Sequence, residues 1–427
     1  MFRCIALNPT HASLQNILWR EDPNQEIKCI QLTTVTYGLK SSSFLATRCL
    51  YELADMHEGE LPLASYILKN CTYVDDILYA NFDLNTTIEA KNQVTQLLER
   101  GSFHTHKWAS NVPQILQNIP ENEQQFDNID FEKDNFNLKT LGINYNVKDD
   151  CFIITCPTKF GDRPVTKREV LSFISKFYDP PGFVAPIIIT AKSFIQTLWA
   201  ANISWDSPLT GDLREKWLLF VKSLDSMAPI TLQRNINTSH ASSTQLIGFA
   251  DASSTTAYGC CIYLRVIHEG NARLYLLCSK SRVNPLNKPL TVPRLELNAV
   301  LLLAKLMVKV HKAISTKITV DNTYLFTDSK IVLAWIGTQI TQLNAYVANR
   351  VQVVAQLTAG WTWHYVPTHD NPADCITRGV TPQELAGNTL WWRGPTFLRN
   401  HEYRFDERLF LAIKTTGEAC SGTLAFV

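Results

Sequence analysis

The spacing of hydrophobic and polar residues predicts short, mixed elements in the first third of the chain. A helical spacing covers residues 43–56 after a turn at Gly38, and a second one covers residues 87–99. Between them, residues 71–82 have the alternating pattern of a β-hairpin. This combination predicts an α+β domain.

The middle of the chain begins with a polar loop and then becomes helical. Residues 117–137 are rich in Asn, Gln, Asp and Glu, which is typical of a surface loop. Two strands are expected next, at residues 138–146 and 151–156, joined by a turn through residues 148–150. From residue 159 to about residue 232 the spacing is helical and is interrupted by prolines. The middle of the chain therefore predicts a helical domain.

A segment rich in Ser, Thr and Asn, residues 235–243, indicates the clearest domain boundary. After it, the pattern is three strands, a helix, a strand, two helices, a strand and a helix, ending near residue 380. This order is typical of an α/β domain with a mixed sheet flanked by helices. The strands are expected at residues 245–251, 256–265, 272–279, 324–328 and 362–366, and the main helices at 292–314 and 329–336.

Composition excludes several classes of protein. Hydrophobic residues make up 45% of the 427 residues, which is enough for several globular cores. The net charge of +1 argues neither for nor against a nucleic-acid partner, because such a protein needs only a local basic surface. The 11 cysteines include no C-x-x-C pair, which favours reduced thiols in an intracellular protein, cytoplasmic or nuclear. We expect no signal peptide and no membrane partner.

Glu296 is the most informative acidic residue in the sequence. It lies nine residues before Lys305 in the expected helix 292–314, a rotation of about 900°, or half a turn beyond two full ones. Glu296 is therefore expected on the apolar face, with Val300 and Leu303. A carboxylate on such a face costs several kcal/mol unless it is paired or binds a metal ion. The alternative is a glutamate that is placed near the helix start because the helix dipole favours it.

Three aspartates lie where strands end or helices begin. Asp251 ends one expected strand and Asp328 ends another, while Asp374 closes an Asn-Pro-Ala-Asp helix start. Taken singly, Asp328 and Asp374 are explained equally well as helix-capping residues, with Asn371 as the expected N-cap of the last helix. Together with Glu296, however, they can converge on one edge of a sheet. Four such carboxylates repel one another unless cations lie among them, and oxygen ligands suit two Mg²⁺ or Mn²⁺ ions.

The segments FADAS, RLELNA, FTDSK and VPTHDNPAD, in this order, resemble the D-E-D-D signature of reverse-transcriptase-linked ribonuclease H. The resemblance implies that Asp251, Glu296, Asp328 and Asp374 are metal ligands. His369 would assist product release or proton transfer. The implied activity is hydrolysis of the RNA strand of an RNA–DNA hybrid, with two divalent cations in the active site.

The N-terminal third resembles a reverse transcriptase palm. Tyr73-Val74-Asp75-Asp76 resembles motif C, which makes Asp75 and Asp76 metal ligands and Tyr73 part of the nucleotide site. The segment QLTTVTYGLKSSSF resembles motif B, FHTHKWASN motif D, and LKTLGINYN the primer grip. The implied partner is a primer–template nucleic acid with two Mg²⁺ or Mn²⁺ ions. Further implied site residues are Gly38 and Ser42 under the templating base pair, Lys107 as a proton donor and Phe2 as the steric gate.

Longer phrases resemble the Pol polyprotein of BEL/Pao-type LTR retrotransposons. They include KREVLSFISKFYDPPGFVAP and NPADCITRG followed by LWWRGP. The implied division is a partial palm at 1–150, a thumb or connection segment at 151–234, a ribonuclease H-like domain at 235–382 and a tail towards an integrase at 383–427. The aspartate of motif A would precede Met1, so the resemblance implies a polymerase site that lacks one ligand and is inactive.

Three other functional interpretations compete with this one. A non-catalytic nucleic-acid-binding remnant would keep the acids without the activity. An aspartic peptidase would need Asp-Thr/Ser-Gly triplets, and the sequence contains none. DDE-type nucleases have a related sheet but end their acid series on Glu, whereas here the Glu is second. The sequence therefore favours ribonuclease H.

Overall fold

The computed structural model describes residues 1–125, 137–140, 142–157, 160–161, 164–287, 289–403 and 405. It separates into two compact units, Met1–Phe152 and Ile153–Val427, and each is described by itself. Helices and several sheets occur together, so the expected α/β multidomain class is confirmed. The division into four domains stays a prediction, and most of the expected tail lies outside the described residues.

Three helices form the core of the first unit. They are α2 (Ser42–His57), α3 (Pro62–Asn70) and α4 (Leu84–Arg100), and the two helices expected from the sequence are α2 and α4. Their apolar faces meet around Leu50, Leu68 and Leu97. The shorter elements are η1 (Phe2–Cys4), α1 (Pro9–Ala12), η2 (Ser13–Gln15), β1 (Asn16–Trp19), β2 (Lys28–Gln31), α5 (Pro113–Leu116) and η3 (Glu121–Glu123).

The expected hairpin at residues 71–82 is present but short. It consists of β3 (Thr72–Tyr73) and β4 (Asp76–Ile77), which pair antiparallel with Tyr73 opposite Asp76. The turn therefore consists of Val74 and Asp75. The adjacent pair Asp75-Asp76 predicts a hairpin turn that carries both aspartates, and this prediction is wrong because Asp76 already pairs with Tyr73 in β4. Val74 has a φ of 55°, in the left-handed region that β-branched residues rarely adopt.

The strand expected at residues 138–146 is a hairpin instead. Its arms are β5 (Asn137–Thr140) and β6 (Ile143–Asn146), which pair antiparallel. Gly142, with a φ of 82°, supplies the turn that an unbroken strand cannot contain. Leu141, part of the primer-grip resemblance, lies outside the described residues.

The second unit is built around a five-stranded sheet in the order β11-β10-β9-β12-β13. The first three strands form the expected antiparallel meander, and β12 and β13 then continue the sheet parallel to β9. The parallel arrangement means that β9, β12 and β13 end at the same edge. The strands are β9 (Ser243–Ala252), β10 (Ala257–His268), β11 (Asn271–Val283), β12 (Asn322–Thr327) and β13 (Thr362–Tyr365).

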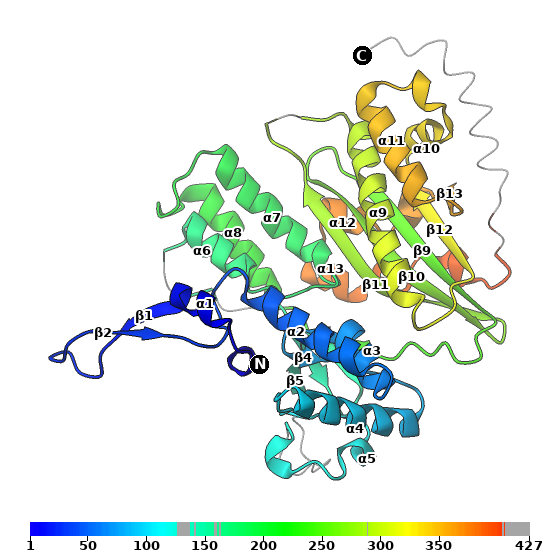
Figure 1. Cartoon of the computed structure of the whole chain (residues 1–427). Coiled ribbons are helices and arrows are strands. Elements are labelled where there is room, and N and C mark those ends of the chain that lie inside the picture. The colour runs from blue at the N-terminus through cyan, green and yellow to red at the C-terminus, as the bar shows by residue number, and fades with distance from the viewer. Residues whose placement is uncertain are drawn as a thin grey trace. The chain divides into compact units, whose positions relative to one another are not determined.

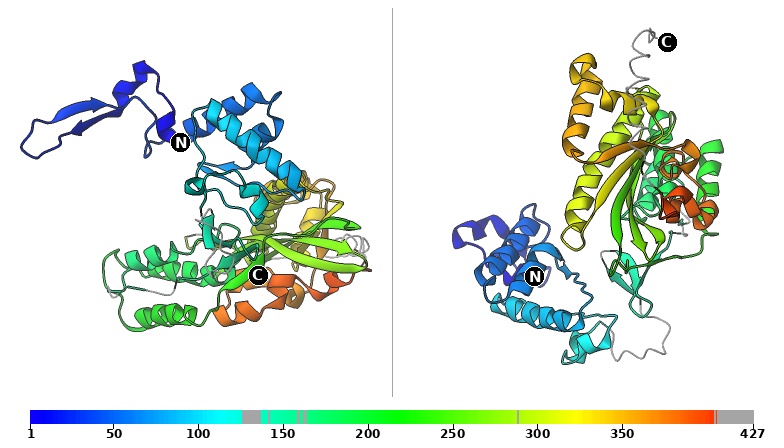
Figure 2. Two further views of the ribbon diagram at one scale, coloured as in Figure 1. Left: turned by 90° about the horizontal axis from the view of Figure 1, so that it is seen from below. Right: turned by 90° about the vertical axis from the view of Figure 1, so that its right-hand side faces the viewer.

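Helices cover both faces of this sheet (Figures 1 and 2). The helix α9 (Val292–Ile314) lies across β9 and β10, with α10 (Lys330–Gly337) and α11 (Ala345–Leu357) beside it. The helices α7 and α12 pack against the opposite face. On this face and beside it are α6 (Lys167–Ile174), α7 (Ala185–Ala200), α8 (Gly211–Leu224), α12 (Asp374–Arg378), α13 (Pro382–Gly387), α14 (Thr389–Arg393) and η6 (Thr396–Arg399); η4 (Ile340–Gln342) and η5 (Thr368–Asp370) are connectors.

The long helix matches its expected bounds, while the helical middle segment differs at its end. Residues 292–314 form α9, and Val300 and Leu303 are fully buried while Lys305 is exposed, as the apolar stripe predicts. The segment expected to stay helical to residue 232 ends in β8 (Ile230–Gln233), and β7 (Cys151–Ile154) is the strand expected before it. In the part of the chain that the structure describes, no helix has the length and hydropathy to cross a membrane.

Candidate active site

The sheet places two of the four acids side by side. Asp251 is the second-last residue of β9, and Asp328 follows the last residue of β12. These strands are parallel neighbours in a register that pairs Thr327 with Ala250, so the next residue of each is Asp328 and Asp251. Both acids therefore lie at the edge where the parallel strands end.

The other two acids reach this edge from helices on opposite faces. Glu296 lies in the second turn of α9, which packs on β9 and β10. Asp374 is the first residue of α12, which also contacts β9 and β10. The sheet edge is thus approached from both sides by carboxylates, because the two helix layers sandwich it.

Three of the four carboxylates are held by a side chain from another segment. The Thr377 hydroxyl donates a hydrogen bond to Asp251, and the Ser329 hydroxyl donates one to Glu296. The Thr368 hydroxyl donates to Asp328 Oδ2 at 2.9 Å. Asp374 differs, because its Oδ1 forms an ion pair with Arg378 Nε at 2.6 Å, one helical turn later. Sequence reasoning missed all four partners, which are Ser329, Thr368, Thr377 and Arg378.

The charge of Asp328 acts on all three other acids. Burial raises the pKa of Asp251 to about 7; Thr377 opposes this shift, while Asp328 and Asp374 add to it. Burial also raises the pKa of Glu296 and of Asp374, and the negative charge of Asp328 raises both further. Asp328 therefore lies within electrostatic reach of each of the other three acids.

Helix capping does not explain Asp328. The N-cap of α10 is Ser329, whose hydroxyl accepts a hydrogen bond from the Val332 amide at 3.3 Å. One oxygen of Asp328, Oδ1, is buried and has no hydrogen-bond partner among the described residues. Burying a carboxylate oxygen without a partner is costly, and a bound cation would remove that cost.

The expected cap at the start of the last site helix was wrong. The helix begins at Asp374 with Ala373 as its N-cap, not Asn371. Asn371 is fully buried and instead joins two segments: its amide group donates to the Ala250 carbonyl and its oxygen accepts from the Ala373 amide, both at 3.1 Å. It therefore fixes the position of the Asp374 segment against β9.

His369 lies in the short helix η5, beside the acids in sequence but facing solvent. Its side chain is 80% exposed, and Nε2 lies 3.4 Å from Asp370 Oδ2. No hydrogen bond links it to the four acids among the described contacts. The imidazole is therefore open to solvent.

The acids fit divalent cations chemically, although they are not gathered around one point. Among the described residues, no three His, Cys, Asp or Glu side chains lie close enough together to hold a metal ion as placed. Instead, the acids are turned towards hydroxyls and Arg378, as mutual repulsion would favour. The oxygen-only donor set and the unpartnered Oδ1 of Asp328 fit Mg²⁺ or Mn²⁺.

In the first unit, the two candidate polymerase acids are exposed. Asp75 lies in the turn and Asp76 begins β4, and both face solvent. Tyr73, opposite Asp76, is 64% exposed. The hairpin brings these three residues together.

The remaining candidate residues of the first unit lie on different elements and differ in exposure. Phe2 is half-buried and its ring lies 6.4 Å from that of Tyr37, while Lys107 is exposed in a loop. Gly38 has a φ of 91°, which favours glycine. Ser42 is buried at the start of α2 and donates to the Thr36 carbonyl, so its hydroxyl already has a structural role.

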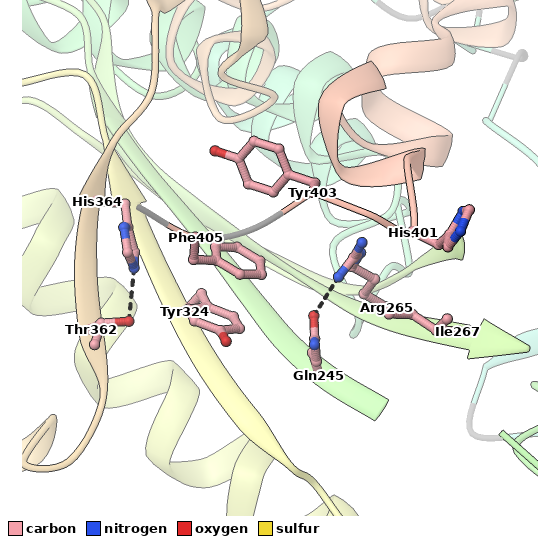
Figure 3. Close-up of a pocket in the computed structure, with 9 residues that line it drawn as sticks. All are labelled: Gln245, Arg265, Ile267, Tyr324, Thr362, His364, His401, Tyr403 and Phe405. Carbon is pink, nitrogen blue, oxygen red and sulfur yellow. Dashed lines mark hydrogen bonds between the residues drawn. The ribbon is translucent and has the colours of Figure 1, made fainter. Parts of the chain in front are cut away.

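A pocket of about 320 Å³ lies away from the acids (Figure 3). It occupies the beginning of the parallel strands, whereas Asp251 and Asp328 lie at their ends. Arg265, which is 1% exposed, lines it and donates to Gln245 Oε1 and to the carbonyls of Leu398 and Asn400. None of its described lining residues is acidic: they are Gln245, Arg265, Ile267, Tyr324, Thr362, His364, His401, Tyr403 and Phe405.

A sheet of this order, with acids at the ends of neighbouring strands and on the flanking helices, defines a ribonuclease H-like domain. Residues 166–329 match a family model described as the Pao retrotransposon-like RNaseH-like domain. The match includes Asp251, Glu296 and Asp328, while Asp374 and His369 follow it. The expected resemblance to a Pao-type retroelement Pol with ribonuclease H is thereby confirmed.

Solved structures show similar folds at low sequence identity. A foamy viral protease–reverse transcriptase in complex with RNA/DNA hybrid aligns at 13% identity, over 86% of this chain and 43% of that one, with a TM-score of 0.50. A second foamy viral structure, in complex with double-stranded DNA, aligns at 13% identity over 85% and 54%, with a TM-score of 0.48. This chain spans about half the length of these two. No curated protein matches it.

Proposed function

We propose that the second unit is a ribonuclease H that hydrolyses the RNA strand of RNA–DNA hybrids, with Asp251, Glu296, Asp328 and Asp374 as ligands of two Mg²⁺ or Mn²⁺ ions. The observation that carries this proposal is the placement of all four acids at one sheet edge: Asp251 and Asp328 at the ends of adjacent parallel strands, and Glu296 and Asp374 on the helices of the two faces. The charge of Asp328 raises the pKa of the other three acids, which supports this placement. A purely structural site would not concentrate four carboxylates at one sheet edge with Arg378 as the one basic partner described for them.

A protein of similar fold supports the class of substrate. The foamy viral protease–reverse transcriptase that aligns with a TM-score of 0.50 is in complex with RNA/DNA hybrid. For this chain we therefore propose an RNA–DNA hybrid as the substrate of the second unit. A primer–template is the proposed partner of the first unit, on the basis of its polymerase-like motifs.

The chain's own residues prepare the site for reaction. The sheet fixes Asp251 and Asp328 as neighbours, and Asn371 fixes the Asp374 segment against β9. When bound, the two cations supply an activated water and stabilise the leaving 3′-oxygen of the phosphodiester. His369, exposed and on a short helix, is the residue proposed to accept or donate a proton at its imidazole as the product leaves.

Cleavage of a labelled RNA–DNA hybrid by the full chain with Mg²⁺ tests this proposal. We expect RNA-strand cleavage in Mg²⁺ or Mn²⁺ and none in a chelator. A protein that binds the hybrid without cleaving it would be the non-catalytic remnant. A folded protein that does neither would contradict the proposal.

A second candidate function, nucleotidyl transfer, concerns the first unit, where Asp75 and Asp76 lie exposed on a hairpin. The resemblance implies that this site lacks one ligand, so the expected result for the chain is no primer extension. The hairpin supports nucleotidyl transfer, because a primer end and cations could reach both acids from solvent. Lys107, Phe2, Gly38, Ser42 and Tyr73 keep their predicted roles in this candidate. Primer extension that disappears in Asp75→Asn would establish it, and absence of extension by the wild-type chain would leave the ribonuclease as the activity.

A further inference from the structure

Three hydroxyl groups at the sheet edge each bind a different acid. Thr377, with no exposed surface, donates to Asp251, which precedes it by 126 residues. Ser329, 5% exposed, donates to Glu296. Thr368, which is exposed, donates to Asp328 Oδ2. Every one of these bonds joins segments that are distant in sequence.

The hydroxyl of Thr377 connects the first acid to the helix of the fourth. Thr377 follows Asp374 by three residues on α12, and its Oγ1 also lies 3.2 Å from the Asp374 carbonyl oxygen. One hydroxyl has one proton, so donation to Asp251 leaves the carbonyl as a secondary contact. The position of Asp251 therefore depends on how α12 is placed.

Ser329 and Thr368 connect the other two acids to their surroundings in the same way. Ser329 accepts from the Val332 amide as the N-cap of α10 while it donates to Glu296. Thr368 lies on η5, in the connection that leads to Asp374, and reaches Asp328 across 40 residues. Each of these three acids is thus tied to an element that carries, or directly adjoins, another acid of the site.

Neutral donors suit acids that must later bind a cation. A hydroxyl restricts the rotation of a carboxylate and stabilises its charge, yet it adds no positive charge that would compete with a metal ion. Arg378 on Asp374 is the contrasting case, because a guanidinium does compete. Three of the four acids have the non-competing kind of partner.

We propose that Thr377, Ser329 and Thr368 are positioning residues, whose hydroxyls orient Asp251, Glu296 and Asp328 for divalent cations. This inference rests on the proposed function for its choice of cation. It concerns binding in the absence of nucleic acid, which can be measured without catalysis. The opposing view is that the hydroxyls only stabilise the fold.

The test is calorimetric titration of the full chain with Mn²⁺, without nucleic acid. We expect Thr377→Val and Thr368→Val to weaken Mn²⁺ binding by roughly 10- to 100-fold, the range known for hydrogen-bond partners of metal ligands. Thr377→Ser keeps the hydroxyl and is expected to bind within about threefold of wild type. Ser329→Ala and Ser329→Thr form the corresponding pair for Glu296.

A matched control is Thr358→Val in the same unit. Thr358 is also buried, 5% exposed, but its hydroxyl donates to the Val354 carbonyl and accepts from Trp363 Nε1, with no acid involved. This variant is expected to lose stability and to keep wild-type Mn²⁺ affinity. Thermal unfolding of each metal-free variant separates the two effects.

Wild-type Mn²⁺ affinity in both Thr377→Val and Thr368→Val would overturn the proposal, as would equal losses in Thr377→Ser and Thr377→Val. Thr368 is exposed, so its variant decides the question even if Thr377→Val does not fold. A wild-type chain that binds Mn²⁺ without cleaving hybrid would refute only the proposed function. A folded wild-type chain that binds no Mn²⁺ would refute both.

Discussion

The two units of the chain present acids in opposite ways. In the first unit, Asp75 and Asp76 are adjacent in sequence and face solvent from a hairpin of two-residue strands. In the second, Asp251 and Asp328 are 77 residues apart and meet at the edge of a five-stranded sheet, where Asp251 is buried and Asp328 is half-buried. Two acids that are adjacent in sequence and exposed require no free energy to bring together. Acids that are buried lose hydration, and this loss must be offset by hydrogen bonds or cations. The second arrangement therefore gives the stronger indication of function.

The largest expected difference between the units concerns hybrid cleavage. We expect Asp251→Asn or Asp328→Asn to reduce the rate of cleavage by more than roughly 100-fold. Loss of a hydrogen-bond partner of a metal ligand costs up to roughly 100-fold, and here a metal ligand itself is lost. Asp75→Asn should leave cleavage unchanged. Initial rates on a labelled RNA–DNA hybrid measure both. Wild-type rates in either second-unit variant would contradict the assignment.

The next effect concerns the free-energy cost of burying Asp251 in the metal-free protein. Burial raises the pKa of Asp251 to about 7, so the folded state favours the protonated form. The contribution of Asp251 to the free energy of unfolding is therefore fully present below its unfolded pKa, near 3.8. It is lost as the pH rises through 7, because the buried side chain must then ionise. At about 1.4 kcal/mol per pKa unit, the loss reaches up to about 4 kcal/mol.

Asp251→Asn should therefore stabilise the metal-free protein at pH 8 while it removes activity. Chemical denaturation in a chelator at pH 4 and pH 8 measures this stability difference. Asp75→Asn, on the exposed hairpin, is the control and should change nothing. Equal stability of wild type and Asp251→Asn at pH 8 would show that burial imposes no such cost.

A smaller pH effect with the opposite sign is expected at His364. Burial lowers the pKa of this imidazole to about 4, so the folded state favours the neutral form. The contribution of His364 to the free energy of unfolding is present above its unfolded pKa, near 6.5. This contribution, roughly 3 kcal/mol, is lost as the pH falls through 4. Denaturation between pH 7 and pH 4 should show this loss in wild type but not in His364→Gln. The exposed His104 of the first unit, changed to Gln, serves as the comparison.

The smallest effect compares a structural hydroxyl of the first unit with Thr377. Ser65 is fully buried between helices and donates to the Ala54 carbonyl at 2.9 Å. Ser65→Ala should cost about 1 kcal/mol of stability, the usual value of one such hydrogen bond, with no change in Mn²⁺ affinity. Thermal unfolding and calorimetry together measure it. Weakened Mn²⁺ binding in Ser65→Ala would show that any lost hydroxyl affects the metal site.

Sequence patterns predicted those helices and strands in which many consecutive residues follow one periodicity. The apolar stripe of residues 292–314 predicted α9 to the residue, because one face of a long helix must be buried. The alternating strands of the meander were predicted for the same reason. The hairpin at Gly142 and the strand at residues 230–233 were missed, because short elements depend on partners that the local pattern does not contain.

The sequence by itself determined which acids are present and placed Glu296 on the apolar face of its helix, since helical periodicity decides which residues share a face. Only the tertiary structure decided that Ser329 rather than Asp328 caps α10, and that Asn371 holds a segment against β9 instead of capping a helix. It also decided which hydroxyl meets which acid, because each of these bonds crosses at least 33 residues of chain. Contacts of this kind depend on how the sheet and its two helix layers pack, and no local pattern encodes them.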